Sequence, residues 1–366
     1  MTKLAQYYLS LLTALSLCAG TLAQQEPAEP DDSLIYITLE EHWVAPALEE
    51  TFNANEATKL LRQADMVPGL FTNLRDVGPR RLANMTANRI RRQVVSHSSN
   101  PAALDKPSLV RQANDQLAAN IANSTDRFSG FAYLPMAYPE VAAAELERCV
   151  RDLGFVGALV DTHLPNGTYY DGAAYRPFWA KAAELDVPVY LHPVWPDPAL
   201  YTDVGVGMYA PAPSMDYSLL TASLLGAAAW GWHQDAGMHF LRLYSAGVFE
   251  EFPTLKIVLG HMGEVVPFML ERADPLLSTN ASRLGLADTY ARNVWITTSA
   301  FFSLNPLATV LRNTAVDRVL YSVDYPFASS VRGSRFMAEL RSSGMVTGEE
   351  WEMIAYKNAE ALLKLK

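Results

Sequence analysis

The alternation of short β-branched runs with longer segments of helical periodicity constrains the fold most. Eight strand-like runs follow one another along the chain, at residues 34–39, 93–95, 128–134, 157–160, 187–191, 255–259, 294–298 and 318–323. Segments between these runs show helical apolar periodicity, at 139–153, 175–185 and 218–249. Parallel strands need crossovers of this length, so the spacing predicts parallel pairing.

Eight strand-then-helix units predict an α/β fold, a (β/α)8 TIM-type barrel. Two further helical stretches, 334–343 and 348–365, are expected as additional C-terminal helices that close it. A doubly wound open sheet is the alternative, because the run at 93–95 is weak and the region 94–127 is open to misassignment. Barrels of this type commonly reach about 250 residues or more, so a length of 366 residues does not require two domains.

The first 33 residues are typical of a secretory leader followed by a spacer. Lys3 precedes an apolar stretch at 9–19, and Thr21-Leu22-Ala23 is a small-x-small sequence of the kind found at cleavage sites. A membrane anchor is the less favoured alternative, because the apolar stretch is shorter than the ~20 residues that a span requires. The predicted organisation is a signal peptide at 1–23, a polar linker at 24–33 and a single barrel domain at 34–366.

This leader predicts a protein of the secretory pathway, either secreted or held in a vesicle or vacuole. Four Asn-x-Ser/Thr sequons fit such a route and are candidate glycosylation sites: Asn84, Asn123, Asn166 and Asn280. Cleavage after Ala23 would remove Cys18 and leave Cys149 as the only cysteine, which excludes an intramolecular disulfide. Cys149 lies in an apolar-periodic segment, where we expect a buried, inert thiol rather than a nucleophile.

The charge balance narrows the possible partners. The chain has 29 Lys and Arg against 39 Asp and Glu, a formal net charge of −10, and no run rich in Lys or Arg. Nucleic acids and anionic membranes both bind through basic surfaces. We therefore expect a small-molecule partner, no nucleic acid, and no membrane once the leader is removed.

Titratable side chains gather where the predicted strands end. Five of them follow or end four different runs: Glu40, His42, His192, His261 and Asp324. His97 and His163 also follow runs, whereas only His233 and His239 fall within a helical stretch. The C-terminal ends of barrel strands form the active-site face, so these residues are expected to converge on one cavity.

The segment Glu40-Glu41-His42 carries the most specific local pattern. Successive side chains of a strand point to opposite faces, so Glu40 and His42 can hold one ion while Glu41 points away. Together with His192 and Asp324 they form a set of two imidazoles and two carboxylates. This set suits one divalent metal ion, Zn²⁺ or Mn²⁺.

Further residues concern the substrate. Arg272 follows His261 by eleven residues, and a guanidinium binds a carboxylate through two parallel hydrogen bonds. A surface ion pair with Glu271 or Asp274 is the alternative for this arginine. Aromatic residues that would face the substrate ring, unless they belong to the core, are Trp43, Phe301 and Phe302.

In order and spacing, these motifs resemble the amidohydrolase-related metal-dependent decarboxylases, the group of aminocarboxymuconate-semialdehyde decarboxylase. The resemblance is closest to the fungal 2,3-dihydroxybenzoate, salicylate and γ-resorcylate decarboxylases. The matching stretches are ITLEEHWVAP (37–46), DRFSGFAYLPM (126–136), AAAELERCVRDLGFVGALV (142–160), ELDVPVYLHP (184–193), FPTLKIVLGHMGEVVPFMLERAD (252–274), NVWITTSAFFS (293–303) and DRVLYSVDYPF (317–327). They cover nearly all of 34–365, and LGHMGE together with SVDYPF is rare outside this family.

Carried over residue by residue, the resemblance implies that one metal is held by Glu40, His42, His192 and Asp324. It also implies that His261 and Glu264 form a relay that supports Asp324, and that Arg272 steadies the substrate. From the residues alone, the less favoured alternative is that Gly263-Glu264 opens the following helix as a cap. The chain departs from some relatives at Ala300-Phe301, where they have Gly-His, and in its loop 195–215. These departures concern substrate choice rather than metal chemistry.

The resemblance predicts a carboxy-lyase: metal-dependent, non-oxidative decarboxylation of an ortho-hydroxylated aromatic acid of the salicylate, resorcylate, dihydroxybenzoate or orsellinate type. The ortho-hydroxyl and a carboxylate oxygen would chelate the metal together, and Asp324 would protonate the ring carbon that carries the carboxylate. The products would be CO2 and a phenol. For this step we expect the acid form of Asp324 to be stabilised by the cavity and by His261.

Two other functions are compatible with the sequence. Related barrels use the same ligands to activate water, so a metal-dependent hydrolase, such as a lactonase or C–C hydrolase, is the first alternative. A non-catalytic secreted binding protein on a retained barrel is the second. Because the family tends towards dimers or tetramers, a homodimer or homotetramer is expected, with residues 267–270 as a candidate interface.

Overall fold

The computed structural model describes residues 34–64, 67–213, 217–278 and 284–365. The predicted signal peptide (1–23), the predicted linker (24–33) and the sequon at Asn280 lie outside the described residues. The segment Leu34–Lys366 forms one compact unit. Among the described residues, no helix combines the length and apolarity that crossing a membrane requires.

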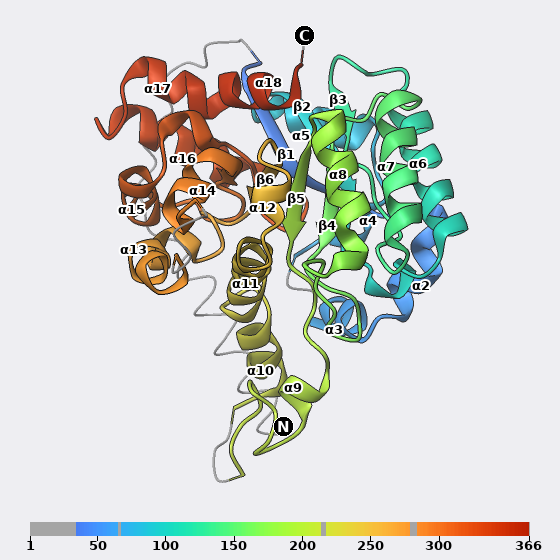
Figure 1. Ribbon diagram of the computed structural model, residues 1–366. Coiled ribbons are helices and arrows are strands. Elements are labelled where there is room, and N and C mark those ends of the chain that lie inside the picture. Colours follow the sequence, from blue (N-terminus) through green and yellow to red (C-terminus); the bar gives the residue numbers. More distant parts are fainter. Residues whose placement is uncertain (1–33, 65–66, 214–216, 279–283, 366) are drawn as a thin grey trace. The chain divides into compact units, whose positions relative to one another are not determined.

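Eight parallel strands form the centre of this unit (Figure 1). They are β1 (Tyr36–Trp43), β2 (Ile90–His97), β3 (Phe128–Gly130), β4 (Ala158–Asp161), β5 (Pro188–His192), β6 (Lys256–Leu259), β7 (Val294–Thr297) and β8 (Val319–Leu320). β1 to β3 pair in chain order, and so do β4 to β8. Isolated parallel bridges join the two sets, Ala132 to Ala158 and Glu41 to Tyr325. The strands therefore run in chain order around a barrel, which confirms the predicted (β/α)8 fold over an open sheet.

Helices form the crossovers between successive strands and surround them (Figure 1). The longer ones are α5 (Pro79–Ala87), α6 (Pro107–Ile121), α7 (Pro139–Arg151), α8 (Arg176–Leu185), α11 (Gly231–Ser245), α13 (Val266–Leu277), α14 (Leu286–Asn293), α15 (Leu304–Asn313) and α16 (Ser330–Ser342). Proline stands in the first turn of α5, α6, α7, α8 and α13, where its fixed φ favours a helix start.

Short helices fill the remaining connections. They are α2 (Glu49–Ala54), α3 (Glu56–Ala64), α4 (Leu70–Leu74), α9 (Ala199–Thr202), α10 (Leu219–Gly226) and α12 (Val248–Glu251), with 3₁₀ turns at Pro46–Leu48, Pro101–Ala103, Ala173–Tyr175 and Val316–Arg318. The chain closes with α17 (Gly348–Glu352), a π-helical turn (Met353–Lys357) and α18 (Asn358–Leu363). Together with α16, these are the additional C-terminal helices that the sequence predicts.

Several elements differ from their predicted bounds; β2, for example, is longer than the run at 93–95, and β3 is shorter than the run at 128–134. β1 continues to Trp43, so Glu40 and His42 lie within the strand rather than after it. β8 ends at Leu320, because side chains replace ladder bonds beyond it; Ser322 N, for example, donates to Thr298 Oγ1 at 3.1 Å. The predicted helix 218–249 is divided by turns into α10, α11 and α12.

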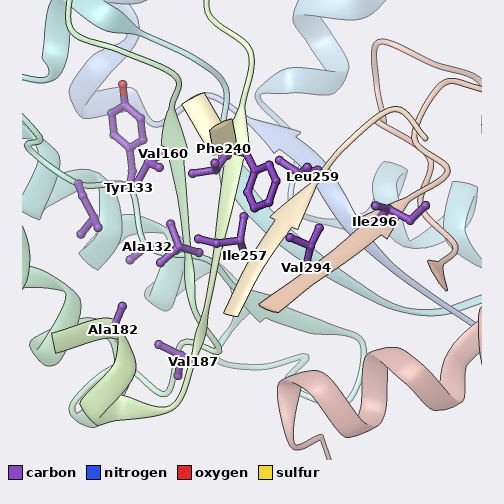
Figure 2. Packing of buried hydrophobic residues seen from close by; sticks show 14 of the residues in the cluster. Ala132, Tyr133, Val160, Ala182, Val187, Phe240, Ile257, Leu259, Val294 and Ile296 are labelled. Carbon is purple, nitrogen blue, oxygen red and sulfur yellow. The ribbon is translucent and has the colours of Figure 1, made fainter. Parts of the chain in front are cut away.

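Alternate strand residues pack on the two sides of the barrel wall. An apolar cluster inside the barrel takes side chains from six strands and from Phe131 just after β3, and it contacts α18: Ile37, Leu39, Val94, Phe131, Leu159, Tyr190, Val258 and Leu320. Outside, Ile257 and Leu259 of β6 belong to a larger cluster with Phe240 of α11 (Figure 2). On β1, the interior apolar residues precede Glu40, so the interior changes from apolar to polar along this strand.

Candidate metal centre

A β-bulge in β1 turns Glu40 and His42 into the barrel. The pairing of β1 with β2 shifts register just before Glu41. The N–H groups of Leu39 and Glu40 both donate to Ser322 Oγ, at 3.0 and 2.8 Å. The extra residue of a bulge reverses the side-chain alternation at that point. Leu39 and Glu40 therefore both face the interior, and Glu41 faces outward as predicted.

The four predicted ligands converge at the C-terminal face of the barrel. One ligand atom from each of Glu40, His42 and His192 lies within 4.8 Å of the other two. His192 ends β5, and its Nε2 is 3.4 Å from Glu40 Oε1. Asp324 follows β8, and its Oδ1 is 3.1 Å from His42 Nε2. Three strands far apart in the sequence thus bring two imidazoles and two carboxylates to one place.

Several atoms of this cluster that could bind a metal ion are buried without a hydrogen-bond partner. They are Glu40 Oε1, His192 Nδ1 and both ring nitrogens of His42. Burial lowers the pKa of His192 to about 3, so its imidazole is neutral and keeps a lone pair for a cation. Unpartnered buried polar atoms are unfavourable on their own. A divalent ion would satisfy them, and the mixed imidazole and carboxylate set fits Zn²⁺ or Mn²⁺.

Tyr190 fixes one oxygen of Glu40 and leaves the other free. Its phenol, on β5, donates to Glu40 Oε2 and lies 2.8 Å from Thr297 Oγ1, which lies 2.8 Å from Ser299 Oγ. Burial raises the pKa of Tyr190 well above its usual value, so the phenol remains a donor. Such a bond orients a carboxylate ligand from behind. The sequence analysis did not predict this role, because Tyr190 lies in an apolar strand without a motif of its own.

His261, Glu264 and His233 form a chain of short contacts beside the cluster. Glu264 Oε1 is 2.7 Å from His261 Nδ1, and Glu264 Oε2 is 2.7 Å from His233 Nδ1. Burial alone would lower the pKa of His261, but the carboxylates of Glu40 and Glu264 raise it well above its usual value. Burial would raise the pKa of Glu264, but His261 and His233 lower it to about 2. His261 is therefore protonated, and its Nε2 lies 3.8 Å from Asp324 Oδ2.

The turn that carries His261 and Glu264 holds five consecutive residues at positive φ. Their φ angles are +46°, +60°, +87°, +52° and +67° from His261 to Val265, and only Gly263 is a glycine. The left-handed region costs other residues about 1–2 kcal/mol each, and such strain collects at functional sites. α13 begins at Val266 without a side-chain cap. The alternative in which Glu264 only caps this helix is therefore wrong.

Asp324 is ionised rather than protonated. Burial raises the pKa of its carboxyl, but the nearby imidazoles of His261 and His42 outweigh this effect and lower it to about 2. The expectation that the acid form of Asp324 is stabilised is therefore wrong for the protein described here. The reason is that two histidines face this carboxylate, and the proton resides on His261.

Two neighbours of the site were not predicted. His233 comes from α11, and its partner Glu264 lies 31 residues further along the chain, so no local motif marks the pair. Phe327 lies edge-on to His42, with 5.4 Å between the ring centroids. Its position at the end of the SVDYPF motif was the available signal.

The predicted aromatic wall is only partly at the site. Phe301 is 40% exposed and lies edge-on to His233, with 5.9 Å between the ring centroids, so it borders the site. Trp43 is buried in the large cluster outside the barrel, because beyond the bulge the odd-numbered residues of β1 face outward. Phe302 packs against Phe336. The expectation that Trp43 faces the substrate is therefore wrong.

Arg272 is not brought to the cluster. It lies on α13, which turns Val266, Pro267 and Leu270 inward, and its own side chain is exposed. Its separation from His261 includes the left-handed turn and then a helix, so sequence distance alone does not set the direction of the side chain. The predicted role of Arg272 in steadying the substrate finds no support in this arrangement.

A second feature is a cavity of about 800 Å³, which we call the β5–α11 cavity. It is lined by the connections after β4 and β5 and by α11, and five of its aromatic residues are Tyr169, Trp195, Tyr201, Tyr209 and Trp232. His163 Nε2 and Asp235 Oδ2 face each other there at 3.3 Å. None of the four predicted metal ligands lines it. Eight residues between Trp195 and Tyr209 line the cavity. They belong to the loop where a departure from relatives is expected, which also contains α9 (Figure 1).

Known proteins match this chain over most of its length. The family model described as Amidohydrolase matches residues 80–365. The decarboxylase orsB of Emericella nidulans is 47% identical over 336 residues, covering 90% of this chain and 97% of that protein. The γ-resorcylate decarboxylase of Rhodococcus jostii is 36% identical over 354 residues, covering 90% and 98%. A dihydroxybenzoic acid decarboxylase from Polaromonas sp. JS666, solved with manganese and 2-nitroresorcinol, gives a TM-score of 0.76 at 33% identity, covering 90% of this chain and 97% of that one.

The barrel and its strand-end ligands define a class of protein, the parallel β/α barrels built around a metal centre. The length of the matches identifies the family within that class. The chain belongs to the amidohydrolase family, and the resemblance predicted from the sequence motifs is confirmed.

Proposed function

We propose that the protein is a metal-dependent carboxy-lyase that releases CO2 and a phenol from an ortho-hydroxylated aromatic acid of the orsellinate or resorcylate type. One observation carries the proposal: unpartnered ligand atoms of Glu40, His42 and His192 meet Asp324 and the protonated His261 in one buried site. The names of the relatives, orsB decarboxylase and γ-resorcylate decarboxylase, support the same chemistry.

The metal ligands in this proposal are Glu40, His42, His192 and Asp324. They would hold one divalent ion, Mn²⁺ or Zn²⁺, which when bound polarises the carboxylate and the adjacent phenol oxygen of the substrate. The manganese bound in the Polaromonas relative supports Mn²⁺. Imidazole ligands also suit Zn²⁺.

The chain's own residues supply the proton. His261 holds it, and Glu264 fixes the imidazole through Nδ1 so that Nε2 faces Asp324. Asp324 takes this proton and passes it to the ring carbon that bears the carboxylate, and a C–H bond forms with loss of aromaticity. The bond to CO2 then breaks, its electron pair restores the aromatic ring, and His261 regains a proton from solvent.

A panel of acids tests this reaction. Purified protein with Mn²⁺ or Zn²⁺ is incubated with orsellinate, γ-resorcylate, salicylate and 2,3-dihydroxybenzoate, and CO2 and phenol are measured. In D2O, one deuterium should appear on the ring carbon that carried the carboxylate. No CO2 from any of these acids with either metal would overturn the proposal. Solvent ¹⁸O in the product would indicate a hydrolase, and a protein with neither bound metal nor activity would be a binding protein.

We propose further that the chain enters the secretory pathway, loses residues 1–23 and carries glycans. Asn123 and Asn166 have exposed side chains, as glycan acceptors need. Asn84 is half-buried and accepts a hydrogen bond from Ser330 Oγ at 2.7 Å, so it is the weakest of the three described sequons. N-terminal sequencing and mass measurement before and after endoglycosidase treatment test this. An N-terminus at Met1 with no change in mass would contradict it.

A homodimer or homotetramer is the assembly that we propose. Within the expected interface 267–270, Phe268 and Met269 are each 49% exposed, whereas Pro267 and Leu270 are buried. Large apolar side chains exposed side by side on a helix favour contact with another chain. Light scattering after gel filtration measures the mass directly, and a monomer would contradict the proposal.

A further inference from the structure

Glu41 is a buried carboxylate that the proposed mechanism leaves unused. It is fully buried on the outward side of β1. Its two oxygens accept four hydrogen bonds, from Val323 N at 3.2 Å, Tyr325 N at 3.2 Å, Gln93 Nε2 at 3.1 Å and Ser322 Oγ at 3.4 Å. The two oxygens of this side chain are therefore bonded to four protein groups at a place where the side chain meets no substrate.

Two of these four donors flank Asp324. Val323 N–H donates to Glu41 Oε1 and Tyr325 N–H to Oε2, so one carboxylate holds the chain on both sides of the predicted ligand. Asp324 has φ +72°, a conformation that costs a residue other than glycine about 1–2 kcal/mol. β8 ends four residues earlier, and beyond it the backbone of the segment is held by isolated bonds, from His42 N to Tyr325 O at 2.6 Å and from Ala300 N to Val323 O at 3.2 Å, beside the two bonds to Glu41.

We propose that Glu41 is a positioning residue for Asp324: its carboxylate clamps the two peptide groups beside Asp324 to the strand that carries Glu40 and His42. The clamp thereby sets the distance between ligands of different strands, which is 3.1 Å from His42 Nε2 to Asp324 Oδ1. This inference rests on the proposed metal-binding function and concerns the geometry of that same site.

A purely structural role for Glu41 makes a different prediction. If these bonds only joined the first and last strands, their loss would lower the melting temperature, and the folded protein would bind metal as before. A positioning role predicts weaker metal binding in protein that is still folded. It also predicts that the loss disappears when Asp324 itself is removed.

Two substitutions separate the length of the Glu41 side chain from its two acceptor oxygens. Glu41→Gln keeps the length, but its NH2 group donates rather than accepts, so it can hold only one of the two flanking N–H groups. Glu41→Asp keeps the carboxyl group but draws both oxygens back by one methylene group. Gln93→Met is the matched control, because it removes a bond to the same carboxylate from β2 and touches neither peptide group beside Asp324.

The first readout is the Mn²⁺ affinity of folded, metal-free protein, measured by titration calorimetry without substrate. We expect about 10–100-fold weaker binding in Glu41→Gln and Glu41→Asp, the range typical for groups that orient a metal ligand. Gln93→Met should change it less than about threefold. In an Asp324→Ala background, Glu41→Gln should also add less than about threefold. Equal losses in both backgrounds, or an equally large loss in Gln93→Met, would overturn the proposal.

The second readout is hydrogen exchange of residues 321–327 in metal-free protein, which depends on neither metal nor chemistry. Exchange should be faster in both Glu41 variants and the same as wild type in Gln93→Met. Unchanged exchange in both Glu41 variants would overturn the clamp whatever the metal result. If exchange behaves as expected but the wild type binds neither Mn²⁺ nor Zn²⁺, the proposed function fails and the clamp stands.

Discussion

The metal cluster and the β5–α11 cavity show two ways in which this barrel builds a site at the ends of its strands. The cluster takes its groups from the strands themselves or from residues just after them, with Glu40 inside β1 and His192 at the end of β5. The cavity takes its walls from the connections, and its polar groups bond to each other: Asp235 lies 3.3 Å from His163 and accepts from Tyr169.

This difference shows how such a barrel can keep the groups that perform the reaction apart from the groups that select the substrate. Groups held by strands keep fixed positions, and those in the cluster keep ligand atoms free for an ion. Connections vary more easily in length and sequence without disturbing the barrel. We therefore expect changes in the cluster to lower the rate, and changes in the cavity to alter substrate affinity at an unchanged rate.

Asp324→Asn should have the largest effect. It removes the group that passes the proton to the ring carbon, and general acid catalysis contributes about 10²–10⁴-fold to rates of this kind. We expect kcat to fall by that factor, measured as CO2 release from the best acid of the panel, with the fold intact by circular dichroism. Asp235→Asn in the cavity is the control and should keep kcat within about twofold. Comparable losses in both variants would remove the distinction between the two regions.

His233→Phe should have the next largest effect. It keeps the ring but leaves Glu264 Oε2 without its partner, so His261 is less firmly oriented. A fall in kcat of about 10–100-fold is expected. His239→Phe on the same helix is the matched control, because burial lowers the pKa of His239 to about 3 and neither of its ring nitrogens has a partner. If both variants kept full activity, the histidine on α11 would not belong to the site.

Trp195→Ala should act on binding rather than on rate. Trp195 lies edge-on to Trp232, with 4.6 Å between the ring centroids, and such pairs contribute about 0.5–1.5 kcal/mol. We expect KM to rise by up to about tenfold while kcat and Mn²⁺ affinity stay unchanged. Trp230→Ala removes an exposed tryptophan that does not line the cavity, and it should change neither parameter. A lower kcat with unchanged KM would contradict a role of Trp195 in substrate binding.

The smallest expected effect is a pH dependence of stability from the cavity. Burial would lower the pKa of His163, but the hydrogen bond and charge of Asp235 outweigh it and raise that pKa. The pair therefore adds stability that is complete below pH ~6.5, the unfolded value, and is lost as pH rises through the folded pKa. Because both side chains are partly exposed, the contribution is about 1 kcal/mol or less.

Urea unfolding of metal-free wild type and His163→Gln at pH 6 and pH 9 measures this contribution. The difference in free energy of unfolding between the two proteins should be largest at pH 6 and should shrink at pH 9. A difference that is the same at both pH values would contradict the ion pair.

The sequence predicted the barrel and the ligand set because both depend on periodicity. Eight β-branched runs separated by helical segments leave few other folds, and parallel strands all end on one face. Glu40 and His42 lie two residues apart and share a face. The bulge in β1 and its effect on side-chain direction could not be predicted, since the bulge depends on Ser322, which lies 282 residues away from Glu40.

The errors have physical reasons as well. Arg272 was assigned from the family resemblance and from the chemistry of its guanidinium, whereas α13, which follows a left-handed turn, leaves its side chain exposed and away from the cluster. The acid form of Asp324 was expected to be stabilised by the cavity and by His261, whereas the imidazoles of His42 and His261 together lower the pKa of its carboxyl. His233 and the β5–α11 cavity depend on how a long connection folds, and local sequence patterns do not determine that.

The four predicted ligands lie between residues 40 and 324, so the first and last strands of the barrel both contribute to one site. During synthesis on the ribosome, the set is incomplete until almost the whole domain has been translated. An ion bound by all four ligands therefore cannot nucleate folding, because the closure of so long a loop must come first. Capture of an ion by all four ligands must therefore follow the synthesis of the segment after β8, and a chain that stalls earlier lacks Asp324 and cannot form the complete site.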